Sequence, residues 1–131
     1  MDKTSDGASQ KFIINGQKPL SGAIKFKGAK NAALKVWPLA LMADEPIRIV
    51  NLPNIEDCYR AQEMLIALGH EAKNLGDGAM QIQLKSRTCV NLPTELVNKF
   101  RASIMFVGPL LVTCGEVYFP HPGGCVIGAG T

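Results

Sequence analysis

The apolar stretch from Ala32 to Met42 constrains the fold of this chain more than any other segment. Lys35 is its only charged residue, and apolar side chains fall on nearly every side of the helix that it predicts. A surface helix carries a polar face, so this pattern predicts a buried central helix. Pro38 predicts a kink or a break before it, and Asp44-Glu45-Pro46 marks the end of the helix.

Helix and strand patterns alternate along the rest of the chain. Residues 55–68 predict an amphipathic helix, with acidic residues in its first turn and Gly69 at its stop position. Thr94 is expected to cap a further helix that runs to about Val107. These elements indicate an α/β (α+β) fold. Short strands are predicted at Lys11–Ile14, Ala23–Lys27, Ile47–Leu52, Glu71–Asn74, Met80–Leu84 and Gly115–Phe119, with turns at Asn15-Gly16 and Gly76-Asp77-Gly78.

One short pattern occurs twice. Val50-Asn51-Leu52-Pro53 returns as Val90-Asn91-Leu92-Pro93, and each copy precedes an acidic residue and a predicted helix. So short a match also arises by chance. The recurrence favours a strand-helix-strand unit that is used more than once.

The composition is that of one modest globular domain. The 131 residues are 47% hydrophobic, which is enough for a core. The net charge of +3 comes from 14 basic and 11 acidic residues spread along the sequence, which excludes the basic stripe of a nucleic-acid-binding protein and suits a small anionic ligand. The longest apolar run, Val107–Val112, is interrupted by Gly108 and Pro109 and is too short to cross a membrane.

The cysteines form neither a CxxC pair nor a metal-ligand pattern with histidine, so no metal and no other cofactor is predicted. They are Cys58, Cys89, Cys114 and Cys125. No apolar segment of signal-peptide type precedes them. The expected state is therefore reduced thiols in a cytoplasmic protein.

Cys125 lies in the segment Pro120–Gly130, which contains four glycines and two prolines. This segment is predicted to be a loop, because prolines remove hydrogen-bond donors and glycines leave the backbone free. A thiol on a flexible loop is placed for chemistry. The alternative is a small hydrophobic residue that follows a simple turn at Gly123-Gly124.

Three local patterns occur in a fixed order along the chain. They are Gly28-Ala29-Lys30-Asn31-Ala32-Ala33-Leu34, Phe100-Arg101-Ala102-Ser103-Ile104, and Gly108-Pro109-Leu110-Leu111 followed by Pro122-Gly123-Gly124-Cys125-Val126-Ile127-Gly128. Together they closely resemble the N-terminal part of the UDP-N-acetylglucosamine enolpyruvyl transferases, the 1-carboxyvinyltransferases that commit sugar nucleotide to peptidoglycan synthesis. The match runs from about Lys11 to Ala129, which is only the first part of the family's length.

The resemblance implies part of an inside-out α/β barrel, built from repeated units of helices packed inside small sheets. It implies strands at 11–27 that in the family pack with the C-terminal domain, and an incomplete N-terminal domain at 28–131. The polar composition of residues 1–10 predicts a disordered extension before them. We therefore expect an incomplete protein that self-associates or requires a complementing chain.

The resemblance also implies a reaction, the transfer of the enolpyruvyl group from phosphoenolpyruvate to the 3′-hydroxyl of UDP-N-acetylglucosamine. This reaction needs cations, an acid and a base, and no cofactor. Lys30 matches the lysine that contacts phosphoenolpyruvate, Asn31 matches a sugar-nucleotide contact, and Arg101 matches a phosphate contact. Cys125 matches the loop cysteine that acts as a proton donor or in product release and is alkylated by fosfomycin. Without the resemblance, the first three residues are a solvated lysine, a helix cap and an arginine that reaches solvent.

The sequence departs from the family's pattern at several positions. Gly130 and Thr131 stand where the family's loop has an arginine and a proline, and that arginine contacts phosphate. Lys35 replaces a usual proline, and Thr113-Cys114 replaces a usual arginine-phenylalanine pair. The acidic residues and the further arginine that complete the family's site are absent from this sequence. We therefore expect the isolated chain to be a weak or inactive catalyst.

Two other functions are left open by the sequence. One is a non-catalytic remnant or split-protein segment that binds a partner chain, which Gly130 and Thr131 favour. The other is the shikimate-pathway enolpyruvyl transferase, which shares the fold and the donor. The Gly-Gly-Cys loop argues against it, because a loop thiol belongs to the sugar-nucleotide branch.

Overall fold

The computed structural model describes residues 13–89, 92–99 and 101–123. Its helical elements are α1 (Lys30–Leu39), the 3₁₀ helix η1 (Ala40–Met42), α2 (Glu56–Ala67), α3 (Thr94–Val97), the 3₁₀ helix η2 (Arg101–Phe106) and α4 (Val107–Cys114). Its strands are β1 (Ile47–Ile49), β2 (His70–Gly76) and β3 (Ala79–Leu84). The predicted α/β (α+β) class is confirmed.

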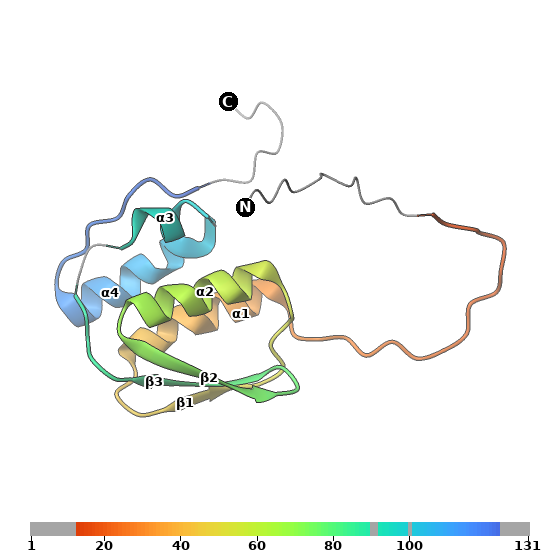
Figure 1. The fold of residues 1–131 in the computed structure, drawn as a ribbon, viewed down its shortest axis with the longest axis horizontal. Coiled ribbons are helices and arrows are strands. Elements are labelled where there is room, and N and C mark those ends of the chain that lie inside the picture. Colours follow the sequence, from red (N-terminus) through yellow and green to blue (C-terminus); the bar gives the residue numbers. More distant parts are fainter. Residues whose placement is uncertain (1–12, 90–91, 100, 124–131) are drawn as a thin grey trace, which may run out of the picture.

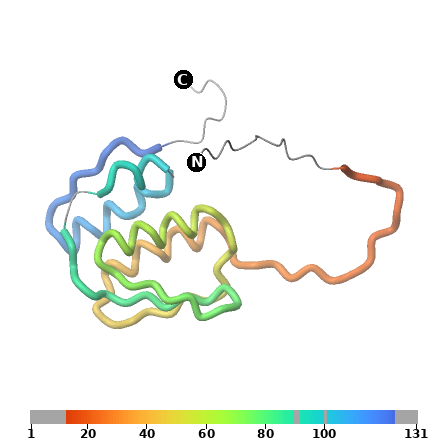
Figure 2. Tube along the Cα trace, in the orientation of Figure 1, coloured from red at the N-terminus to blue at the C-terminus, as the bar shows by residue number. Residues whose placement is uncertain are grey.

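The strands form one antiparallel sheet in the order β1-β3-β2. In its register, Ile47 lies opposite Ile82 and His70 lies opposite Leu84. Helices α1 and α2 lie side by side over one face of the sheet, and α3, η2 and α4 gather at one end of this pair (Figures 1 and 2). The sequence predicts α2 and the β2–β3 turn at Gly76-Asp77-Gly78 almost to the residue.

The core lies between the helices and the sheet. Its large buried side chains include Leu34, Trp37, Leu41, Ile49, Met64, Leu65, Ile82, Leu92, Phe106 and Leu110. Leu52 and Leu92, which occupy matched positions in the recurring pattern, are 8% and 2% exposed. Each is followed by a helix. Leu52 and Leu92 therefore have the same structural role, to anchor the chain in the core before a helix begins.

Helix α1 is buried on one face and open on the other. It continues through Pro38, so the predicted break is absent, and the chain then tightens into the 3₁₀ helix η1. Val36, Leu39 and Met42 are 37%, 55% and 47% exposed. The predicted burial on every side is thus wrong for this face, because no described segment covers it.

Three predicted strands are absent from the part of the chain that the structure describes. Ile13–Ile14 and Ala23–Lys27 have no regular structure, and their large apolar side chains are 83–87% exposed. This segment runs away from the helices and the sheet (Figures 1 and 2). Gly115–Phe119 is also irregular. A strand needs a neighbour for its backbone hydrogen bonds, and no described segment pairs with any of these three. Lys11, at the start of the first one, lies outside the described residues.

The single helix predicted from Thr94 to Val107 is divided into α3, η2 and the start of α4. Pro93, not Thr94, is the N-cap residue of α3, and no side chain caps this end. The fully buried Ser103 hydroxyl donates to the carbonyl of Val97 over 3.3 Å. This bond satisfies a carbonyl at the end of α3 and favours the tight turn over a continuous helix.

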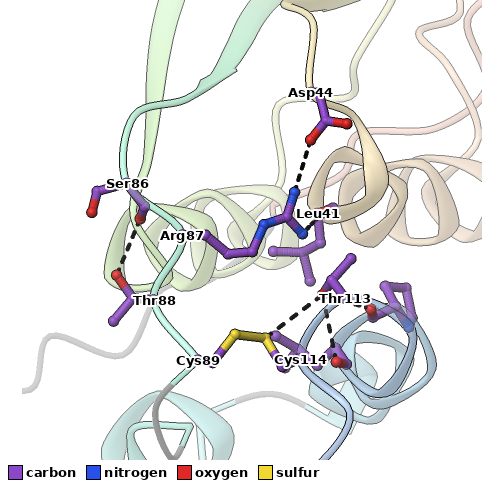
Figure 3. Close-up of a disulfide and its surroundings, with 10 residues drawn as sticks. Leu41, Asp44, Ser86, Arg87, Thr88, Cys89, Thr113 and Cys114 are labelled. Atoms are coloured by element: carbon purple, nitrogen blue, oxygen red, sulfur yellow. Dashed lines mark hydrogen bonds and ion pairs between the residues drawn. A yellow bond between two sulfur atoms is a disulfide. The ribbon is translucent and has the colours of Figure 1, made fainter.

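A disulfide joins Cys89 to Cys114, so the prediction that these thiols are reduced is wrong (Figure 3). The chain after β3 brings Cys89 to the last residue of α4, where the two Cα atoms are 5.5 Å apart. Sequence spacing does not reveal this contact, because it depends on how α4 packs. Beside it, Arg87 pairs with Asp44 at 2.9 Å and donates to the carbonyl of Leu41 at 3.3 Å (Figure 3). These contacts tie the segment after β3 to η1 and α4.

Candidate functional site

Lys30 and Asn31 are the first two residues of α1, and both are exposed. The N-cap residue is Ala29, with no capping side chain, so the reading of Asn31 as an ordinary cap is wrong. The first amide groups of an α-helix have no partner within the helix and carry partial positive charge. The start of α1 therefore combines backbone donors, an ammonium group and a side-chain amide on one exposed end.

The chain is held tightly at the entrance to α1. The Gly28 amide donates to the carbonyl oxygen of Asn51 over 3.0 Å, and a Cβ at Gly28 would lie 2.2 Å from that oxygen. Asn51 has a left-handed backbone (φ 57°). The next amide, from Leu52, donates to the carbonyl of Gly78 over 2.8 Å. These bonds fix the start of α1 against the turn that leads into α2.

Lys30 forms an ion pair with Asp57, which lies in the first turn of α2. The Lys30 side chain is 58% exposed, whereas the Asp57 side chain is 25% exposed. The partly buried carboxylate thus anchors an ammonium group that still faces solvent. The sequence predicts Lys30 as a site residue, and Asp57 only as one of the acidic residues in the first turn of a helix. The signal that could have found the pair is their shared place at the starts of two neighbouring helices.

Arg101 is the first residue of η2, and its side chain is exposed. It makes no hydrogen bond or ion pair with any residue in the described part of the chain. Because η2 packs against α1, the structure places Arg101 on an element adjacent to the one that carries Lys30 and Asn31. The guanidinium group reaches solvent, where an anion can approach it.

Cys125 lies outside the described residues. Gly123 is described, and its amide donates to the carbonyl of Val97 at the end of α3 over 3.3 Å. A Cβ at Gly123 would lie 1.7 Å from the carbonyl oxygen of Asn98, so this approach requires glycine. The chain that leads to Cys125 therefore passes close to α3, which itself contacts η2.

A cavity of about 340 Å³ opens elsewhere, between α1, α2 and the β2–β3 hairpin. Its lining includes Trp37, Cys58, Tyr59 and Asn74, and none of Lys30, Asn31 and Arg101. Burial raises the pKa of the Cys58 thiol. The thiol is thus kept protonated, as in a structural cysteine.

The described residues contain no cluster of His, Cys, Asp and Glu that could bind a metal ion. None of the helices within residues 13–89, 92–99 and 101–123 is long and apolar enough to span a membrane.

Comparisons with known proteins point to one family. The family model described as EPSP synthase (3-phosphoshikimate 1-carboxyvinyltransferase) matches residues 14–129. The chain is 39% identical to a UDP-N-acetylglucosamine 1-carboxyvinyltransferase of Treponema denticola, over 89% of this chain and 28% of that protein. It is 41% identical to the enzyme of the same name from Dinoroseobacter shibae, over 90% of this chain and 28% of that protein.

A solved structure has the same fold. The enolpyruvyl transferase NikO from Streptomyces tendae superimposes with a TM-score of 0.68 at 27% identity, over 76% of this chain and 23% of NikO. The chain spans about 28% of the length of the curated relatives that it matches.

Proposed function

Because this chain belongs to the EPSP synthase family of enolpyruvyl transferases, we propose that it supplies one part of a site that transfers an enolpyruvyl group. In this proposal, the donor is phosphoenolpyruvate and the acceptor is the 3′-hydroxyl of UDP-N-acetylglucosamine, so that the reaction is the first committed step of peptidoglycan synthesis. The names of the relatives support this acceptor. No cofactor takes part.

The observation that carries the proposal is the position of Lys30 at the amide end of α1. A helix N-terminus attracts phosphate and carboxylate groups, and an ammonium group there adds a full positive charge. We assign Lys30 to phosphoenolpyruvate and the adjacent Asn31 to the sugar nucleotide. The exposed Arg101 guanidinium, on the neighbouring η2, is assigned to ligand phosphate.

We assign to Cys125 the role of proton donor to the methylene carbon, or a role in product release. Either role needs an accessible thiol whose protonation responds to nearby cations. Gly130, in place of a phosphate-binding arginine, removes one cation from the loop. We therefore expect slow turnover at best from the chain alone.

Fosfomycin labelling tests the proposal. The chain is incubated with fosfomycin, with and without UDP-N-acetylglucosamine, and adducts are mapped by mass spectrometry. We expect a Cys125 adduct that increases with the nucleotide, no adduct at the buried Cys58, and no loop adduct in a Cys125→Ser control. Shikimate 3-phosphate in place of the nucleotide should have no effect. Absence of a Cys125 adduct, or labelling of Cys125 that does not change when the nucleotide is added, would contradict the role assigned to Cys125.

A second candidate function is binding to a partner chain, and the exposed apolar surface favours it. Leu20, Ile24 and Phe26 are 97%, 83% and 85% exposed, and the outer face of α1 is open as well. Surfaces of this kind mark association sites. Sedimentation should show self-association or a stable complex with a complementing chain, and a purely monomeric chain at high concentration would count against this function.

A cytoplasmic location is part of the proposed function. In a reducing cytoplasm, the Cys89–Cys114 pair would be exposed to glutathione and thioredoxin. Alkylation of free thiols in lysed cells, followed by peptide mapping, would show which state the pair has there. A fully oxidised pair would argue for a more oxidising compartment.

A further inference from the structure

We propose that Asp57 is a positioning residue that orients the Lys30 ammonium group toward the anion bound at the start of α1. This inference rests on the proposed function, because it concerns how the same site binds phosphoenolpyruvate. The two residues form an ion pair across the starts of α1 and α2.

The backbone around the pair supports a fixed geometry. Lys30 follows Gly28, whose amide is bonded to the carbonyl of Asn51. The same turn continues through Leu52, which is bonded to the β2–β3 hairpin, and leads into the first turn of α2, where Asp57 lies. Both ends of the ion pair thus belong to one hydrogen-bonded unit. On this fixed backbone, the ion pair with Asp57 restricts the direction of the long Lys30 side chain.

Burial separates the roles of the two partners. The Asp57 side chain is 25% exposed and so partly buried, whereas the Lys30 side chain is 58% exposed and open to solvent. An ammonium group carries three N–H donors. Because the Lys30 side chain is largely open to solvent, a phosphate or carboxylate group of the ligand can approach it.

The sign of the effect distinguishes positioning from simple charge. Asp57 is negative and lies near the proposed anion, so electrostatics alone predict that Asp57→Asn strengthens anion binding. If Asp57 orients Lys30, the same substitution weakens binding, because the ammonium group loses its direction. Glu56→Gln is a matched control, since it removes a neighbouring negative charge of α2 that pairs with Arg60 instead.

The test measures the reactivity of Lys30 in the full chain. Acetic anhydride labels the lysines, and mass spectrometry gives the rate at Lys30 relative to the exposed Lys35 of the same helix. Protection by phosphoenolpyruvate, with UDP-N-acetylglucosamine present, gives the affinity at Lys30. Asp57→Asn should increase ligand-free labelling and weaken protection about 5-fold, an effect comparable to a strong exposed ion pair. Asp57→Glu should restore part of the protection, and Glu56→Gln should change neither quantity.

Two results would overturn the positioning role. One is equal ligand-free labelling of Lys30 in Asp57→Asn and Glu56→Gln. The other is protection in Asp57→Asn that is unchanged or stronger while the unsubstituted chain binds normally. Lack of protection in the unsubstituted chain is a different outcome, because it contradicts the proposed function itself.

Discussion

Removal of the Cys89–Cys114 disulfide should destabilise the chain strongly. The two cysteines are 25 positions apart, and the enclosed segment contains α3, η2 and α4. In the chain-entropy treatment, a cross-link that closes a loop of this length stabilises the folded state by about 3.5 kcal/mol. Its removal should lower the free energy of unfolding by that amount. That is a large fraction of the roughly 5–15 kcal/mol that stabilises an ordinary domain. The corresponding fall in melting temperature is roughly 10–15 °C.

The assay is urea unfolding followed by circular dichroism, with and without a phosphine reductant. A double variant, Cys89→Ser with Cys114→Ser, should have the lower stability without reductant and should not respond to it. Neither the reductant nor the substitutions change Arg87, Asp44 or Leu41, whose contacts lie beside the disulfide, so the comparison is directed at the cross-link. A loss below about 1 kcal/mol on reduction, or four free thiols in the purified chain under air, would refute the reasoning.

Three further results are expected. Burial lowers the pKa of His70 from its ordinary 6.5. The neutral ring therefore contributes stability above pH 6.5, and this stability is lost as the pH falls through 6.5 toward the lower folded-state pKa. The urea midpoint should decrease from pH 7.5 to 5, and His70→Gln should reduce that decrease. Gly28→Ala should cost about 1–3 kcal/mol in thermal unfolding, because its Cβ would lie 2.2 Å from the Asn51 carbonyl oxygen, whereas Gly16→Ala, with open space around it, should be near neutral. Trp37→Phe should cost about 1–2 kcal/mol against 3–5 kcal/mol for Trp37→Ala, since the buried Nε1 has no hydrogen-bond partner among the described residues that the substitution would remove; equal losses would contradict this.

Local sequence signals predicted the elements that local contacts determine. The helix at Glu56–Ala67 has an acidic first turn, a regular apolar face and Gly69 with φ 87° just after it. The hairpin turn has its glycines at the positions where the backbone has positive φ. At both places, propensity and hydrophobic pattern agree with the final packing.

The failures occurred where a partner segment decides the structure. Ala23–Lys27 has a strand pattern and no neighbouring strand among the described residues, so it remains irregular. Cys89 and Cys114 meet only because α4 packs beside the segment after β3. Both arrangements depend on tertiary packing, which local sequence patterns do not show.

The candidate site was predicted only in part. The resemblance identified Lys30, Asn31 and Arg101, and the structure places the first two at the start of α1 and the third on an adjacent element. Asp57 was missed as a site residue, because its place at the start of a helix reveals the contact with Lys30 only once α1 and α2 are known to be neighbours. The assignment of Cys125 stays a prediction.

The most direct test of the proposed site is a ¹H–¹⁵N NMR titration of the chain with phosphoenolpyruvate and UDP-N-acetylglucosamine. The account predicts shifts that centre on Lys30, Asn31 and Arg101, with little change at the cavity residues Trp37 and Cys58. Saturating ligand that leaves the start of α1 unchanged, or that shifts only the cavity residues, would contradict it.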